Sequence, residues 1–193
     1  TDMMPTRIFG KPFTVTEFNF SLPNRYRIEG GPLLGAYAAL QDWDGLYRFA
    51  WSHTNSRMEN PKVALNHFDS VNNLQAQMSD RILHALFLQG NVQTAKEAYA
   101  LIIPPEEHGL LKIGAGTFPY EQTLLGLHSG IGAASSSELA PKVKPIYSSS
   151  RDWREALSAT ADSALRQLEE SGKITSSTGE IKLDTKAKLL EVT

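Results

Sequence analysis

Residues 12–20 form the run Pro12-Phe13-Thr14-Val15-Thr16-Glu17-Phe18-Asn19-Phe20, which is apolar and β-branched except for one carboxylate near its end. A short run of this kind, with turn residues before and after it, is typical of a strand buried on both faces, as in a parallel sheet. Glutamate is disfavoured inside such a strand and costly to bury. At the carboxyl end of a parallel strand, however, Glu17 would lie where α/β barrels hold their catalytic groups. The alternative is a solvated glutamate at the end of a strand, with no catalytic role.

A helix and a second strand follow this run. Apolar residues recur at helical spacing over Leu33–Asp42, after Pro32 at a position that suits a first helical turn. The stretch Leu46–Trp51 is again largely apolar and predicts a second buried strand. Strand, helix and strand in this order define a βαβ unit, in which a right-handed crossover makes the two strands parallel neighbours.

The remaining elements are predicted from the same periodicities. Two longer helices are expected, at Asn73–Gln89 with Gly90 as its stop, and at 152–171 with Ser150 or Asp152 as its cap. The shorter predicted elements are a polar loop at 52–60, a helix from Pro61 to Phe68, a strand at Tyr99–Ile103, a helix around Tyr120–Leu127, and two alternating antiparallel strands at Glu180–Asp184 and Lys188–Val192.

Composition narrows the class of protein. The chain has 193 residues, 41% of them hydrophobic, which is enough to bury a real core. The formal net charge is -2 and there is no Lys/Arg block, so neither nucleic acid nor an anionic membrane is an expected partner. No apolar run reaches membrane-spanning length. Because the chain begins at Thr1 rather than Met, a processed or truncated product is expected. Compartment and oligomeric state are not indicated, although a secreted or periplasmic location is favoured.

No cofactor or metal is expected from the motifs. Without cysteine, the chain can hold no disulfide, thiolate zinc site or cysteine nucleophile. The five histidines are scattered, and none has the H-E-x-x-H spacing of a zinc protease. Neither a G-x-G-x-x-G motif, a P-loop nor a G-x-S-x-G elbow is present.

The segment from Lys11 to His53 resembles the last two strands of a retaining glycoside hydrolase barrel of clan A. The resemblance is carried by the 12–19 run, by Glu29-Gly30, by the 36–45 stretch that ends in Asp42-Trp43-Asp44-Gly45, and by the 46–51 strand. Two later stretches, at 87–92 and 178–181, resemble the link from such a barrel into a C-terminal β domain.

The resemblance implies roles for two residues. In that clan the catalytic nucleophile is a glutamate at the end of the seventh strand, which corresponds to Glu17. An aromatic residue at the end of the eighth strand commonly forms the floor of the sugar site, which corresponds to Trp51. The clan's acid/base glutamate follows an asparagine at the end of the fourth strand, and no Asn-Glu pair occurs in this chain. A full barrel has eight βα units and only about two fit here. The resemblance therefore implies a piece of such an enzyme, with its acid/base upstream of Thr1.

Other residues near the two strand ends are candidates for binding substrate. Sugar sites offer aromatic platforms and a few polar groups. Trp43 is a second candidate platform, and Asn19 and His53 are candidates for binding hydroxyl groups. The alternatives are that Trp43 packs in the core and that Asn19 and His53 are ordinary loop residues. Arg48 within its strand requires a carboxylate partner, because a buried guanidinium is costly unless paired. Arg25, Arg27 and Arg48 are the candidate donors that would keep Glu17 ionised.

The expected fold class is α/β, namely the last two βα units of a (β/α)8 barrel followed by helices and the start of a C-terminal β domain. The expected boundaries are 1–90 for the barrel part, 91–172 for the post-barrel linker and helical segment, and 173–193 for the β domain. The expected function is that of a fragment of a retaining glycoside hydrolase, inactive in isolation, which cleaves β-linked sugars by a two-carboxylate double displacement. The alternative is a non-catalytic carbohydrate-binding or structural α/β module, in which Trp51 and Trp43 matter and Glu17 does not.

Overall fold

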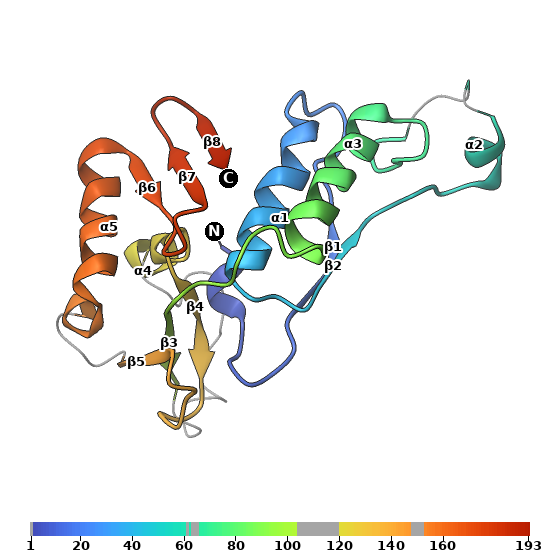
Figure 1. Ribbon diagram of the computed structural model, residues 1–193. Helices are drawn as coiled ribbons and strands as arrows, with labels where there is room; N and C mark the ends of the chain where they lie inside the picture. Colours follow the sequence, from blue (N-terminus) through green and yellow to red (C-terminus); the bar gives the residue numbers. More distant parts are fainter. Residues whose placement is uncertain (1, 61, 63–65, 104–119, 148–152) are drawn as a thin grey trace. The chain divides into compact units, whose positions relative to one another are not determined.

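A computed structural model of the chain describes residues 2–60, 62, 66–103, 120–147 and 153–193. The chain folds into two compact units (Figure 1). One, called here the β1–β2 unit, comprises residues 13–39 and 43–92. The other, the β3–β8 unit, comprises residues 1–12, 40–42 and 93–193. Together they form a mixed α/β protein with two parallel sheets and one small antiparallel sheet. The predicted three-part division at residues 90 and 172 stays a prediction.

The predicted βαβ unit is confirmed. Strand β1 (Thr14–Phe18) pairs in parallel with β2 (Gly45–Arg48), and helix α1 (Gly30–Leu40) connects them. Helix α3 (Leu74–Leu83) follows and ends in the π-helical turn η3 (His84–Leu88), close to the predicted helix boundaries. Gly90 has a positive φ of 68°, as expected of a residue just after a helix end. The short elements η2 (Arg27–Glu29) and α2 (Asn55–Glu59) complete this unit.

The expectation that the first strand is buried on both faces is wrong. Among the five residues of β1 only Val15 is buried. The pairing of β1 with β2 shifts between Val15 and Phe18, which lie opposite Leu46 and Arg48, so β1 carries one extra residue. A bulge of this kind places Val15 and Phe18 on the same face of the sheet, although they are three positions apart. The other face carries exposed side chains, Glu17 from β1 and Tyr47 from β2.

The covered face of this sheet looks towards the helices. Arg48 of β2 contacts Asp80 of α3, and its guanidinium lies 4.8 Å above the ring of Phe18. Helices α1 and α3 approach closely because a glycine stands at their contact: the backbone N–H of Gly31 donates to the Ser79 hydroxyl at 2.7 Å. A methyl group at Gly31 would overlap the Ser79 backbone. Among the described residues of this unit, the two strands are therefore packed against helices on one side.

Two other predictions in this unit need correction. The polar segment at 52–60 is not all loop, since it contains the short helix α2, none of whose residues is buried. The predicted helix from Pro61 to Phe68 falls mostly on residues 61 and 63–65, which lie outside the described part, and residues 66–68 are not helical. Helix α2 is short and without an apolar stripe, which explains why hydrophobic periodicity did not indicate it.

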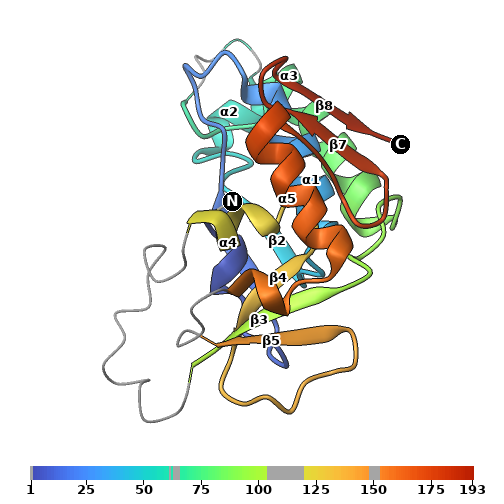
Figure 2. The same ribbon diagram turned by 90° about the vertical axis from the view of Figure 1, so that its left-hand side faces the viewer.

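The β3–β8 unit contains a buried parallel sheet in the order β4-β3-β5 (Figure 2). Its strands are β3 (Ala98–Ile102), β4 (Gly130–Ala134) and β5 (Val143–Tyr147), and every residue of β3 and β4 is buried. Strand β3 was predicted within one residue. Strands β4 and β5 were not, because the Gly130-Ile131-Gly132-Ala133-Ala134 stretch has low strand propensity and Pro145 interrupts β5.

Helices and a second sheet accompany this core. The short η1 (Met4–Thr6) precedes a bridge between Ile8 and Ala133, and α4 (Tyr120–Leu125) confirms the helix predicted around 120–127. Helix α5 (Ala159–Ser171) follows the turn η6 (Trp153–Ala156) and begins seven residues later than predicted, at the cap Ser158. The antiparallel sheet β6-β7-β8 confirms the predicted hairpin and adds an unpredicted third strand. Its strands are β6 (Lys173–Thr175), β7 (Ile181–Asp184) and β8 (Leu189–Val192).

A half-buried carboxylate ties α5 to the parallel sheet. Glu97, which directly precedes β3, accepts hydrogen bonds from the Ser158 hydroxyl at 2.5 Å and from the Lys144 ammonium at 3.0 Å. The backbone N–H of Ser158 donates to the Tyr99 hydroxyl at 3.0 Å, and its Oγ caps α5 through Ala161. Burial alone would raise the pKa of Glu97, but the hydrogen bonds from Ser158 and Lys144 together outweigh it and lower that pKa.

This network predicts a pH-dependent stability. Because the pKa of Glu97 is lower in the folded than in the unfolded chain, its carboxylate stabilises the fold above the unfolded pKa, and this contribution is lost as the pH falls through the folded pKa. We expect Glu97→Gln to cost about 1 kcal/mol of unfolding free energy at neutral pH, measured by urea unfolding. The difference from wild type should shrink below about pH 4, whereas Glu138→Gln, at an exposed position, should behave as wild type. A cost that is equal at neutral and acidic pH would contradict this account of Glu97.

Candidate functional site

Glu17 lies one residue before the carboxyl end of β1, and its side chain is exposed. The bulge in β1 separates Glu17 from the buried Val15 and sets it on the uncovered face of the sheet. Tyr47 of β2 lies on the same face and is 61% exposed. Bulges often re-aim a side chain next to an active site. In the described part of the chain, Glu17 has neither a hydrogen bond nor an ion pair. The structure thus leaves this carboxylate available to an incoming group.

The three arginines predicted as donors to Glu17 are engaged elsewhere. Arg48 pairs with Asp80, so the carboxylate partner that its position required is found, but on α3 rather than on β1. Arg27 is completely buried and donates to the backbone carbonyls of His67 and Asp69, both at 3.0 Å. Arg25 donates to the hydroxyl of the neighbouring Tyr26 at 2.6 Å. The expectation that one of them holds Glu17 ionised is therefore not supported by their positions.

Arg48 and Asn19 form a structural hub rather than an open binding surface. The Asn19 amide donates to the backbone carbonyls of Phe49 and Phe68, the latter at 2.8 Å, and its Oδ1 accepts from Arg48 at 3.3 Å. Burial raises the pKa of Asp80, although Arg48 beside it acts in the opposite direction. These contacts use the polar atoms with which Asn19 and Arg48 would bind a sugar. These contacts position the ends of β1 and β2, and the predicted substrate contacts of Asn19 and Arg48 stay a prediction.

His53 is held by a buried acid on the loop after β2. Its Nδ1 lies 2.5 Å from Oδ1 of Asp69, whose side chain is fully buried, and Arg57 donates to the other carboxylate oxygen at 3.1 Å. The His53 ring also packs edge-on against Phe49, with ring centroids 5.2 Å apart. The side chain of His53 remains 35% exposed. Asp69 thus fixes the ring on one side while the other ring nitrogen remains the natural contact for a ligand.

The two tryptophans predicted as sugar platforms differ sharply. Trp51 follows β2 and is 56% exposed, so one ring face is open to a ligand. Trp43 is only 6% exposed and packs against Phe13, with ring centroids 5.1 Å apart. Trp43 is therefore a core residue, and its predicted role as a sugar contact is corrected. Both tryptophans stand next to apolar stretches of the sequence, so the sequence pattern alone did not indicate which of them is buried and which is exposed.

Asp69, Asp80 and Arg57 were missed by sequence reasoning. Each acts through a partner 12 to 32 positions away in the chain, and such pairings leave no local periodicity. The position of Arg48 within a strand predicted that an acidic side chain lies near it, but the sequence did not identify that side chain as Asp80. Among the described residues there is no group of three or more histidine, aspartate or glutamate side chains that could hold a metal ion. No helix in that part of the chain is long and apolar enough to cross a membrane.

The candidate residues on the β1–β2 unit are therefore an exposed carboxylate near the end of a parallel strand, an exposed indole, and a histidine held by a buried acid. Comparison of the chain with protein-family models, with curated proteins and with solved structures gave no match.

Proposed function

We propose that the β1–β2 unit is the last two βα units of a (β/α)8 barrel, and that the parent protein is a retaining glycoside hydrolase with Glu17 as its nucleophile. The observation that carries the proposal is the placement of Glu17. A bulge sets this exposed carboxylate near the carboxyl end of a parallel strand, on the face of the sheet that no helix covers among the described residues of the β1–β2 unit. In a (β/α)8 barrel the helix-free face of each strand lines the barrel, and the carboxyl ends carry the chemistry.

The reaction follows from one attacking and one proton-transferring carboxyl group about 5–5.5 Å apart. Glu17 attacks the anomeric carbon, and the bond from that carbon to the leaving oxygen breaks while the second carboxylic acid protonates this oxygen. The product of this step is an ester between the sugar and Glu17. The second group then takes a proton from water, which attacks the anomeric carbon and releases Glu17 as a carboxylate. The second group comes from upstream strands in this proposal.

Trp51 and His53 are the substrate-binding residues in this proposal. The exposed indole of Trp51 offers an apolar platform for the C–H face of a sugar ring. The ring of His53 is oriented by Asp69, which leaves its outward nitrogen for a hydroxyl group. Arg48, Asn19 and Asp80 keep the two strand ends in register and do not touch the sugar.

The second candidate function is a non-catalytic carbohydrate-binding module. It is favoured by the missing Asn-Glu pair, because without it the given sequence offers no acid/base group of the kind that the clan uses. In that case Trp51 binds the sugar and Glu17 has no chemical role. Binding and cleavage must therefore be measured together.

A titration with β-linked oligosaccharides separates these functions. We expect Trp51→Ala to weaken binding about tenfold or more, because the aromatic platform is lost, whereas Tyr120→Ala, which removes an aromatic ring 68% exposed in the other unit, should bind as wild type. Products in the parent protein, analysed by NMR at early times, should retain the β-configuration at the anomeric carbon. Binding lost in Trp51→Ala without any hydrolysis by the parent would favour the binding module. Unchanged binding in Trp51→Ala would count against both functions.

A further inference from the structure

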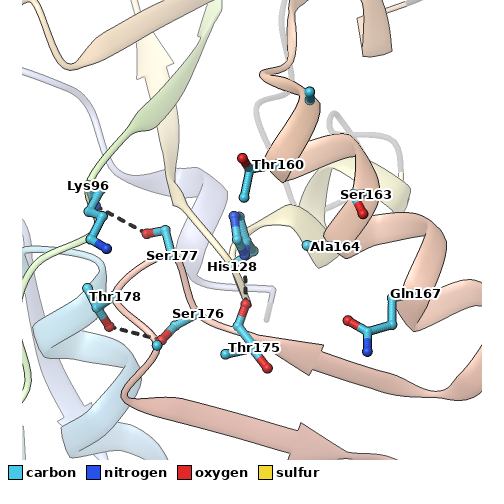
Figure 3. Close-up of a pocket in the computed structure, with 12 residues that line it drawn as sticks. Lys96, His128, Thr160, Ser163, Ala164, Gln167, Thr175, Ser176, Ser177 and Thr178 are labelled. Carbon is cyan, nitrogen blue, oxygen red and sulfur yellow. Dashed lines mark hydrogen bonds between the residues drawn. The ribbon is translucent and has the colours of Figure 1, made fainter.

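A separate open pocket lies in the β3–β8 unit, away from the residues discussed above. Its volume is ≈ 590 Å³, within the size range of small-molecule sites. The pocket is lined by the first turns of α5, by the turn between β6 and β7, by Lys96 and by His128 (Figure 3). Every one of these residues belongs to the same compact unit. Nine of the twelve lining residues have polar side chains, and the small residues Ala159 and Ala164 lie among them.

His128 supplies the most informative atom of this pocket. Its side chain is only 4% exposed, and Nδ1 lies 2.7 Å from the backbone oxygen of Thr175. A carbonyl oxygen can only accept, so Nδ1 carries the proton and donates. In the neutral imidazole with its proton on Nδ1, Nε2 is a hydrogen-bond acceptor. Nε2 is buried and has no hydrogen-bond partner among the described residues. An unsatisfied buried polar atom costs free energy, and a bound hydrogen-bond donor would remove this cost.

Hydroxyl and amide groups line the same pocket on either side of His128. Figure 3 shows Thr160, Ser163 and Gln167 along α5, with His128 between Thr160 and Thr175. On the opposite side, the Ser177 hydroxyl oxygen accepts from the backbone N–H of Lys96 at 3.1 Å, which leaves its hydroxyl proton free to donate. Hydroxyl groups both donate and accept, and the Gln167 amide can do both as well. The Lys96 ammonium adds donors at the rim.

We propose that this pocket binds a polyhydroxylated ligand, namely a sugar unit. Such a ligand donates a hydroxyl proton to the lone pair on His128 Nε2 and exchanges hydrogen bonds with Thr160, Ser163 and Ser177. The methyl groups of Ala159 and Ala164 accommodate its C–H surface. A phosphate group would need a proton on Nε2, and it is the competing ligand that the test below includes. The proposal does not depend on Glu17, which lies in the other unit.

The test is a titration of the 193-residue chain with methyl β-D-glucopyranoside, methyl β-D-galactopyranoside and inorganic phosphate. The ¹⁵N resonance of His128 Nε2 is followed by NMR, since it shifts when the lone pair accepts a hydrogen bond and reports on this pocket alone. We expect a saturable shift with at least one glycoside, with a Kd on the order of 1 mM, as befits a ligand of about a dozen heavy atoms. Failure at this nitrogen is thus distinguishable from failure of the Glu17 proposal.

Two variants locate the binding. Ser163→Leu fills the pocket from an exposed helix position and should weaken binding at least tenfold without unfolding the chain. Ser136→Leu makes the same change at an exposed position outside the pocket and should bind as wild type. No saturable shift with either glycoside, a shift with phosphate only, or equal binding by Ser163→Leu and wild type would each overturn the proposal. A shift of His128 Nε2 with a glycoside that Ser163→Leu abolishes would support it.

Discussion

If the proposed function holds, replacing Glu17 by Gln in the parent protein is expected to lower kcat by roughly 10³-fold or more, because an amide cannot form the glycosyl ester. A factor of this size corresponds to about 4 kcal/mol of lost transition-state stabilisation. Since Glu17 is exposed and has no partner among the described residues, the substitution should leave the unfolding free energy nearly unchanged. The measurement is kcat on an aryl β-glycoside, together with urea unfolding of the same variant.

A second variant identifies the role of Glu17 as nucleophile rather than as a contact. In Glu17→Ala, added azide should restore cleavage of an activated aryl glycoside and give a glycosyl azide of inverted configuration, because azide attacks where the carboxylate did. Glu29→Gln changes another exposed carboxylate of the same unit and should leave kcat within about twofold of wild type. Full activity in Glu17→Gln would exclude Glu17 as nucleophile.

Replacing Asp69 by Ala is expected to cost about 3 kcal/mol of unfolding free energy. The carboxylate is fully buried and joins His53 Nδ1 to Arg57, so its removal leaves both partners without their acceptor. Because the side chains of His53 and Arg57 are 35% and 24% exposed, water can partly replace the lost contacts, and the cost should not exceed this range. Urea unfolding followed by tryptophan fluorescence, to which the buried Trp43 of the same unit contributes, measures the cost.

The conservative change Asp69→Asn retains an acceptor for His53 and should cost roughly half as much. The matched control is Glu191→Gln, which breaks an exposed ion pair with Lys182 and should cost less than about 0.5 kcal/mol. If Asp69→Ala were as stable as wild type, the buried acid would have no structural role, and His53 would have no fixed orientation towards a ligand.

Local patterns were sufficient to predict the βαβ unit and the C-terminal hairpin. The β1–α1–β2 order follows from a switch between apolar runs and helical spacing, and the strands at 181–192 follow from strict alternation. Strands β4 and β5 were missed because Gly130, Gly132 and Pro145 give no strand signal. Their burial in a parallel sheet, rather than their own propensity, forms them.

The candidate site was predictable only in part, for a related reason. Glu17 and Trp51 stand out because each interrupts or ends an apolar run. The bulge that aims Glu17 away from Val15 depends on pairing with β2 and has no signature in β1 itself. Likewise, the sequence places Arg48 in a strand, but its contact with Asp80 is made 32 residues later. Whether an aromatic residue such as Trp43 is buried is also decided by distant packing, here against Phe13.

Covalent trapping of Glu17 tests the central claim most directly. The protein from its native source is treated with a β-configured 2-deoxy-2-fluoro glycosyl fluoride, which lets the ester form but slows its hydrolysis, and its intact mass is recorded before and after. The account predicts a mass above the 21.3 kDa of this chain, an increase by one sugar residue, and a label on the peptide that contains Glu17. A protein of 21.3 kDa that takes up no label, or a label on any other residue, would contradict it.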